Sequence, residues 1–153
     1  MKILMVCLGN ICRSPLAEGL LKNKIKKYNL AAFVDSCGFE YEHLGCQPDY
    51  RAIEIASRHN IDITDQKARL FHPSYFDNFD KIYVMDSNNY RMVASKARSK
   101  KDLEKVELIM NVVKPGSNIP VPDPYFGRQE HFVETFRMLD EATDKIIDLI
   151  RKN

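Results

Sequence analysis

The sequence predicts an α/β protein built on a parallel sheet. Four short runs have the apolar composition of strands and alternate with patterns of helical spacing; the predicted strands are 2–7, 33–36, 80–86 and 106–110. Strands that alternate with helices pair in parallel through right-handed crossovers. Ligands of such sheets bind at the carboxyl ends of the strands, so the loops that follow the strands are the first place to look for a site.

The predicted helices are 15–27, 49–59, a short turn opened by Pro73 and Ser74, 87–97 and 130–151. Ser14 is a hydroxyl residue that can cap the first of them, and Pro15 suits a first helical position. Ser87 can cap the helix at 87–97. The basic stretch 96–101 is predicted to be a solvated loop.

Composition predicts one compact domain that spans residues 1–153. A net charge of +2 is too small to indicate nucleic acid or a membrane surface as a partner. No apolar run approaches the roughly 20 residues of a membrane-spanning helix. Met1 and Lys2 lead directly into the first predicted strand without a signal-peptide pattern, so a cytoplasmic location is expected.

The stretch between the first strand and the first helix carries the chemistry. It begins with Cys7 and ends with Arg13 and Ser14, and five residues separate the thiol from the guanidinium. A loop of this length can curl around one tetrahedral anion, with the amides of residues 8–14 as donors and Arg13 forked onto two oxygens. Positive potential of this kind favours the thiolate form of Cys7.

A cysteine, five residues, an arginine and a serine indicate nucleophilic attack on phosphorus through a phosphocysteine. Gly9 allows close approach of the backbone, and Asn10 tolerates a left-handed conformation. The Ser14 hydroxyl can donate its proton to the Cys7 sulfur, which would hold the anion ready and improve sulfur as a leaving group.

The run Val-Cys-Leu-Gly-Asn-Ile-Cys-Arg-Ser-Pro at 6–15 resembles the phosphate loop of the low-molecular-weight protein tyrosine phosphatases, and Asp-Pro-Tyr-Phe at 123–126 resembles that family's second motif. The resemblance implies a sheet of order 2-1-3-4 with helices on both faces. It implies hydrolysis of phosphotyrosine in tyrosine-phosphorylated proteins, with inorganic phosphate as product. No metal or other cofactor is expected, because Arg13 supplies the counter-charge and no ligand cluster is evident in the sequence.

The resemblance also implies roles for individual residues. Cys7, Arg13 and Asp123 would be catalytic, with Asp123 as general acid. The phosphate would be bound by Leu8, Gly9, Asn10, Ile11, Cys12, Arg13 and Ser14. Asn10, Ser14 and Ser36 would form the supporting network. The substrate cleft would be lined by Leu8, Tyr41, Glu42, Tyr125 and Phe126.

Three positions leave alternatives open. Glu42 stands where the family usually has Trp or Tyr, so either Tyr41 takes that place or this wall of the cleft is acidic. Gln66 stands where the family has a histidine in the network beneath the loop; it can donate and accept similarly but cannot titrate. The family often has a cysteine at the position of Cys12, which can form a reversible disulfide with the nucleophile and protect it from over-oxidation; the alternative is that Cys12 is only a small buried residue.

Three other functions compete with the tyrosine phosphatase. An arsenate reductase of similar fold uses further cysteines downstream, and no cysteine follows Cys46. A protein arginine phosphatase carries Thr where this chain has Ile11. A phosphotyrosine-binding module without activity would lack Cys7, Arg13 or Asp123, and all three are present.

Overall fold

The computed structural model describes residues 1–152 and confirms the predicted sheet. Four strands, β1 (Lys2–Val6), β2 (Phe33–Cys37), β3 (Lys81–Val84) and β4 (Val106–Leu108), form one parallel sheet of order β2-β1-β3-β4. Met5 of β1 pairs with Ser36 on one side and with Tyr83 on the other. The two central strands are β1 and β3, and the loop that follows β1 therefore emerges near the middle of the sheet edge.

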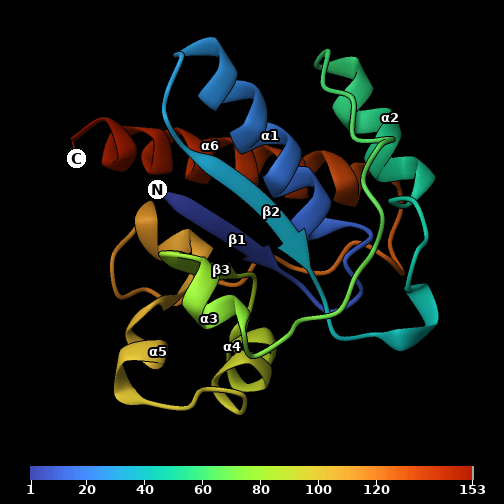
Figure 1. Cartoon of the computed structure of the whole chain (residues 1–153). Helices are drawn as coiled ribbons and strands as arrows, with labels where there is room; N and C mark the ends of the chain where they lie inside the picture. The colour runs from blue at the N-terminus through green and yellow to red at the C-terminus, as the bar shows by residue number, and fades with distance from the viewer. Residues whose placement is uncertain (153) are drawn as a thin grey trace.

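Helices cover both faces of the sheet (Figure 1). They are α1 (Arg13–Lys27), α2 (Tyr50–Arg58), α3 (Tyr75–Asn78), α4 (Ser87–Ala94), α5 (Lys100–Glu104) and α6 (Gln129–Lys152), with 3-10 turns η1 (Tyr41–His43) and η2 (Ile109–Val112). In Figure 1, α1, α2 and α6 lie on one side, and α3, α4 and α5 lie on the other. None of the helices within residues 1–152 has the length and apolar composition needed to cross a bilayer.

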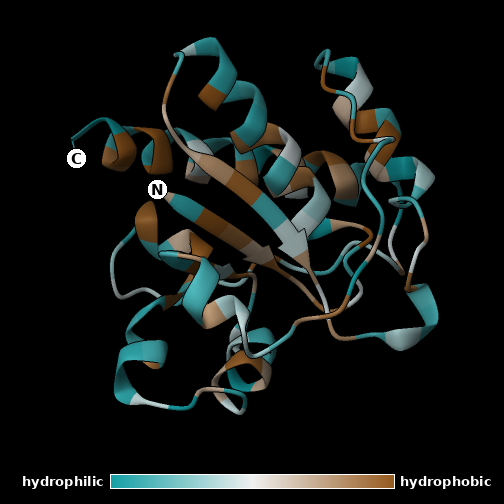
Figure 2. Cartoon of the chain, viewed as in Figure 1, coloured by the Kyte–Doolittle hydropathy of each residue, from teal (hydrophilic) through white to brown (hydrophobic). Residues whose placement is uncertain are grey.

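Each face of the sheet buries its own apolar cluster. Ile3 and Met5 of β1 point toward α1, α2 and α6, while Leu4 and Val6 point toward the aromatic side chains around α3. This alternation follows from the two-residue period of a strand. Figure 2 shows the result as apolar strands between helices whose outer faces are hydrophilic.

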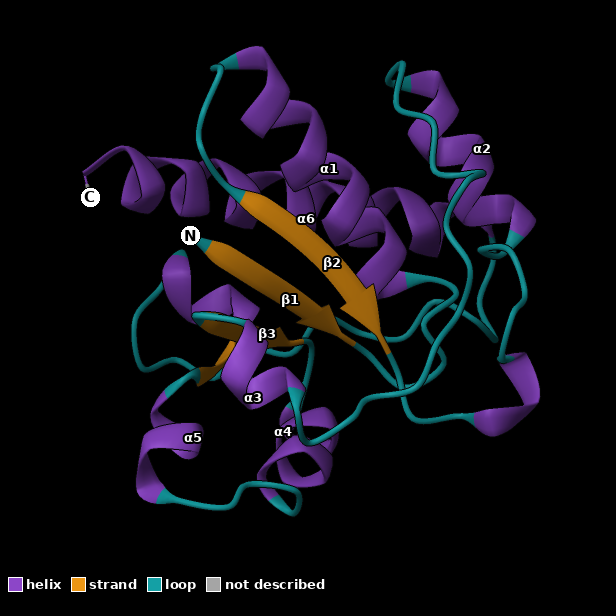
Figure 3. Cartoon of the chain, in the orientation of Figure 1, coloured by secondary structure: helices purple, strands orange, loops and turns teal. Residues whose placement is uncertain are grey.

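The loops that follow the strands gather at one edge of the molecule. In Figure 3 the arrowheads of β1 and β2 point to a region made of loop, and the segments after them run side by side there. An isolated parallel bridge between Gly38 and Leu70 joins two of these segments. The candidate site lies at this edge.

Several predicted boundaries are wrong in detail. The fourth strand ends at Leu108, because Ile109 and Met110 continue into the 3-10 turn η2 while staying buried. An apolar run cannot distinguish these two backbones. Helix α1 begins at Arg13, so Ser14 lies inside its first turn and does not cap it. Asp86, not Ser87, caps α4, since its carboxylate accepts from the Asn89 amide at 2.8 Å.

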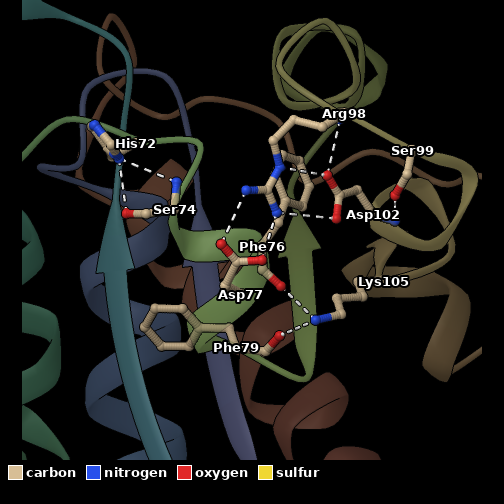
Figure 4. Close-up of polar contacts among 9 residues, drawn as sticks. All are labelled: His72, Ser74, Phe76, Asp77, Phe79, Arg98, Ser99, Asp102 and Lys105. Carbon is tan, nitrogen blue, oxygen red and sulfur yellow. Dashed lines mark hydrogen bonds and ion pairs between the residues drawn. The ribbon is translucent and has the colours of Figure 1, made fainter.

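The basic stretch 96–101 is also more ordered than predicted. Arg98 donates to Asp77 at 2.6 Å and to Asp102 at 3.0 Å, and Ser99 caps α5 by accepting from the Asp102 amide (Figure 4). In the same view Lys105 donates to the carbonyls of Phe76 and Phe79, which joins α5 to α3. Arg98, which lies in the stretch predicted to be a solvated loop, therefore links α3 to α5 through its ion pairs with Asp77 and Asp102.

His72 is a surface residue, as predicted. Figure 4 shows its ring bound to Ser74, with 2.8 Å between Nδ1 and the hydroxyl and 3.1 Å between Nδ1 and the amide nitrogen. The ring thus fixes the turn that opens α3 and is not a substitute for the network histidine discussed above.

Candidate active site

The candidate site is a pocket at the carboxyl end of β1. Its base is made by residues 7–9 and 11–13, and its rim is made by Glu40, His43, Asp123, Tyr125 and Phe126. The pocket therefore brings the two sequence motifs together, although 117 positions separate their first residues at 6 and 123. The strand that ends at Val6 and the helix that starts at Arg13 fix the two ends of the loop.

Cys7 lies buried at the base of this pocket. Its backbone amide extends the β1–β2 pairing by donating to the Cys37 carbonyl at 3.3 Å. Its sulfur lies 2.9 Å from the Ser14 hydroxyl oxygen and accepts from the Asn10 amide at 3.3 Å. Asn10 has φ 55, a left-handed conformation, as its residue type predicts. The Asn10 amide thus donates to the sulfur, and the Ser14 hydroxyl lies within hydrogen-bonding distance of it.

Asn10 also orients the hydroxyl that meets the sulfur. Its side-chain amide donates to Ser14 Oγ at 2.8 Å and to Ser36 Oγ at 3.0 Å. Because Ser14 Oγ accepts from Asn10, its own proton can point at Cys7 or at the more distant Cys37 carbonyl, 3.5 Å away. The three residues predicted to form a supporting network are thus brought together by hydrogen bonds.

The network continues to a residue that the sequence analysis missed. Ser36 donates to Glu18 Oε1 at 2.6 Å, and the other Glu18 oxygen accepts from Lys22 at 3.0 Å. Burial raises the pKa of Glu18, and the hydrogen bond from Ser36 and the charge of Lys22 oppose that rise. Glu18 sits in the apolar stripe of α1, and its buried position depends on contacts between α1 and β2 that spacing alone does not reveal.

Gln66 does not complete this network. Its amide donates to the Pro15 carbonyl at 3.1 Å, and its Oε1 is buried without a hydrogen-bond partner in the part of the chain that the structure describes. Arg69 supports the loop instead, since its backbone amide donates to Asn10 Oδ1 at 3.0 Å and its side chain donates to the Ser36 carbonyl at 3.0 Å.

Arg13 is buried below the pocket with only 2% of its surface exposed. Its Nη1 donates to Asp86 at 2.7 Å and to the Val121 carbonyl at 2.8 Å. Its Nη2 lies 3.6 Å from Asp123 Oδ2, a longer and weaker contact. Asp86 was not predicted as a site residue, although its position at the carboxyl end of a strand was a usable signal.

Asp123 lies at the mouth of the pocket with 38% of its side chain exposed. Its Oδ1 accepts from the Tyr125 amide at 3.2 Å, which holds the carboxylate above the loop. The proline-rich segment that carries it is fastened to the sheet, because the Val121 amide donates to the Met85 carbonyl at 2.8 Å. The segment is thus held both by its prolines and by the end of β3.

Arg51 of α2 anchors the far side of the same segment. It donates to the carbonyls of Tyr125 at 2.8 Å and Gly127 at 3.0 Å, and it pairs with Asp49 at 2.9 Å. The Asp49 amide in turn donates to the Ile11 carbonyl at 2.8 Å. One arginine thereby connects the segment that bears Asp123 with the loop that bears Cys7, and nothing in its sequence context indicated this.

The prediction for one cleft wall is wrong. Tyr41 is 75% exposed and, like Glu42, is not among the residues that line the pocket. The 3-10 turn at 41–43 directs these two side chains outward, so that Glu40 before it and His43 at its end face the pocket. The other wall lies where predicted, with Tyr125 half-buried and Phe126 95% exposed at the rim.

Cys12 shares the pocket with Cys7 but has a different environment. Burial raises the pKa of Cys12, and the charge of Asp49 adds to the rise, so this sulfur stays a thiol at neutral pH. Both cysteines are free. The protective disulfide between them remains a prediction.

Glu40, Glu42 and His43 form the one group within residues 1–152 whose side chains could hold a metal ion. Their ligand atoms lie within 4.8 Å of one another. No ligand cluster is predicted from the sequence, because these residues come together through the turn at 41–43. Exposed acidic groups often lie this close without an ion. Glu40 and His43 of this group also line the pocket, whereas Glu42 does not.

The fold and the pocket together define an α/β protein with a cysteine-centred anion loop. The family model described as "Low molecular weight phosphotyrosine protein phosphatase" matches residues 2–153. A relative of that name from Schizosaccharomyces pombe is 36% identical over 152 residues, which cover 97% of this chain and 96% of the relative. The chain belongs to the low molecular weight phosphotyrosine protein phosphatase family.

Solved structures agree with this assignment. A protein tyrosine phosphatase from Entamoeba histolytica superposes with a TM-score of 0.91 at 32% identity, covering 99% of this chain and 97% of the other. A drosophila arginine phosphatase superposes with a TM-score of 0.87 at 29% identity, covering 97% and 96%. Enzymes named for two different phosphorylated residues thus share this fold.

Gly38 provides a test of how tightly the loop is held. A Cβ atom at Gly38 would lie 2.8 Å from both the Asn10 nitrogen and the Leu8 carbonyl oxygen, which are backbone atoms that cannot yield without moving the loop. We expect Gly38→Ala to weaken binding of inorganic phosphate at least about tenfold, or 1.4 kcal/mol, measured by titration calorimetry.

Gly45→Ala is the control for this change. A Cβ at Gly45 meets nothing within 4 Å, but its φ of +82 disfavours alanine, so this variant loses stability without moving the loop. Phosphate affinity that fell equally in both variants would contradict the proposed contact between Gly38 and the loop.

Proposed function

We propose that this chain is a protein-tyrosine-phosphatase that hydrolyses phosphotyrosine through a phosphocysteine intermediate. The observation that carries the proposal is the position of the Cys7 sulfur, 2.9 Å from the Ser14 hydroxyl at the base of a pocket that also contains the buried Arg13. Residues 1–153 would act as one phosphatase domain. Arg13 supplies the counter-charge for the phosphate, so the proposed reaction needs no metal and no other cofactor.

In the first step the Cys7 thiolate attacks phosphorus and the bond to the tyrosine oxygen breaks. Asp123, in its protonated form, gives its proton to the departing oxygen, so the leaving group departs as a neutral phenol. The amides of residues 8–14 and the Arg13 guanidinium hold the non-bridging oxygens while charge redistributes. Asp86 keeps Arg13 in place at 2.7 Å, which leaves Asp123 free for proton transfer.

In the second step water releases the phosphate. Asp123, now a carboxylate, takes a proton from a water molecule whose oxygen attacks phosphorus. The bond between sulfur and phosphorus breaks, and inorganic phosphate leaves. Ser14 can stabilise the sulfur as it regains negative charge, because its hydroxyl lies 2.9 Å from the sulfur and can donate to it.

The rim of the pocket supports an aromatic substrate. Tyr125 and Phe126 offer ring surface beside the phosphate site, and a phenyl ring gains contact there that a short aliphatic side chain cannot reach. We therefore propose tyrosine-phosphorylated proteins as substrates. Neither nucleic acid nor a membrane is a proposed partner, and a cytoplasmic location would keep the Cys7 thiol reduced.

Phosphoarginine is the second candidate substrate. The similarity to the drosophila arginine phosphatase and the Glu40 carboxylate at the rim favour it, since a carboxylate can pair with a guanidinium. Ile11, which lines the pocket with an apolar side chain, favours the aryl group. Arsenate reduction is not proposed, because no cysteine follows Cys46 to receive the oxidation.

The proposal is tested by comparing hydrolysis of phosphotyrosine, phosphoserine and phosphoarginine, with a chelator present. We expect phosphotyrosine to have the highest kcat/KM. Cys7→Ser should reduce turnover to the uncatalysed level, because a serine hydroxyl in this site is a far weaker nucleophile. Cys46→Ser is the control, since Cys46 is exposed and lies outside the pocket. Substantial activity of Cys7→Ser, or faster hydrolysis of phosphoarginine, would overturn the proposal.

Asp123→Asn tests the proposed proton donor. It should lower kcat for phosphotyrosine by about 10²–10⁴ and leave the affinity for inorganic phosphate nearly unchanged. The loss should shrink for an aryl phosphate whose leaving group is a weak base, since such a group needs no proton. Asp148→Asn, at an exposed position on α6, controls for the change in net charge. An equal loss for both leaving groups would argue against general-acid catalysis by Asp123.

A further inference from the structure

The wall of the pocket that contains Glu40 carries a carboxylate with no role in the proposed mechanism. The backbone amides of Phe39 and Glu40 both donate to the Leu8 carbonyl, at 2.7 and 3.1 Å. The start of this wall is therefore hydrogen-bonded directly to the phosphate loop. The backbone of Glu40 is thereby fixed relative to the loop that is proposed to bind phosphate.

The Glu40 carboxylate lies directly over the loop. Its Oε1 is 3.5 Å from the place that a Cβ of Gly9 would occupy, and the His43 ring is 3.2 Å from the same place. His43 also meets the opposite wall, since its ring and that of Tyr125 lie 6.0 Å apart in an edge contact. Glu40 and His43 thus stand where the rest of a bound substrate leaves the pocket.

Within residues 1–152, the Glu40 carboxylate forms no ion pair with a lysine or an arginine. The nearest cationic candidate is His43, whose Nε2 lies 3.8 Å from Glu40 Oε2 and is charged only when protonated. Burial and the neighbouring Glu42 raise the pKa of Glu40, while His43 opposes the rise. Asp123 adds a further negative charge at the same rim, and Arg13 is engaged by Asp86. A dianionic phosphate would thus enter between carboxylates.

A basic group on the substrate would relieve this repulsion. We propose that Glu40 is a specificity-determining residue that selects phosphotyrosine flanked by a lysine or arginine and disfavours phosphotyrosine flanked by acidic residues. This inference rests on the proposed function. The substrate cation would lie against Glu40, with the tyrosine ring between the loop and Tyr125, and the pair would be partly shielded from water by His43.

Three peptides test this inference. They share one sequence around phosphotyrosine and carry lysine, alanine or glutamate at both flanking positions, and they are assayed with a chelator at low ionic strength. Wild-type protein should show a kcat/KM about tenfold higher for the lysine peptide than for the glutamate peptide. The ratio should fall as salt is added, because salt screens partly exposed charges.

Glu40→Gln should bring the ratio close to one while the alanine peptide is still hydrolysed. Glu104→Gln, at an exposed position on α5, is the matched control and should keep the wild-type ratio, because it removes the same charge elsewhere. A wild-type ratio near one, or an unchanged ratio in Glu40→Gln, would overturn the inference. A preference that requires added zinc would overturn it in favour of a metal at Glu40, Glu42 and His43.

The alanine peptide separates this inference from the proposed function. Hydrolysis of that peptide without a charge preference would refute the role of Glu40 alone. Failure to hydrolyse any of the three peptides would refute the phosphotyrosine phosphatase itself, and the specificity role with it.

Discussion

The site depends on a buried guanidinium. Arg13 is a permanent cation with 2% of its surface exposed, and burying such a charge is unfavourable unless it is paired and hydrogen-bonded. Asp86 from the end of β3 and the Val121 carbonyl from the proline-rich segment meet this requirement. The end of one strand, the start of α1 and a segment more than 100 residues away must therefore converge at one edge of the sheet. The pocket is a consequence of that convergence.

Two acidic groups near Arg13 are suited to different tasks. Asp86 makes a short contact and caps α4, so it is fixed and suited to charge balance. Asp123 makes a longer contact and is partly exposed, which suits a group that must exchange a proton.

The two cysteines of the loop, Cys7 and Cys12, also differ in their surroundings. The Cys7 sulfur accepts from the Asn10 amide and meets the Ser14 hydroxyl, whereas burial raises the pKa of Cys12. The local environment, more than the residue type, therefore distinguishes the proposed nucleophile Cys7 from Cys12.

The sequence was sufficient for the sheet, its order and the central motif, because these depend on local spacing and on a resemblance carried by short motifs. It could not reveal Glu18 or Arg51, whose positions depend on contacts between distant elements, whereas Asp86 at the end of a predicted strand could have been proposed from its place in the chain. It also misassigned the cleft wall, since one 3-10 turn decides whether Tyr41 or Glu40 faces inward. Ser14 does not cap α1, because the helix begins at Arg13 and the Ser14 hydroxyl lies 2.9 Å from the Cys7 sulfur.

The central claim is that phosphate is transferred to Cys7. The most direct measurement is rapid acid quench of the wild-type protein during turnover of an aryl phosphate, followed by mass spectrometry with fragmentation to locate the phosphoryl group. The account predicts a phosphoryl group on Cys7, formed together with a burst of released phenol. A phosphoryl group on Cys12 or Ser14, or steady turnover with no phosphorylated residue and no burst, would contradict it.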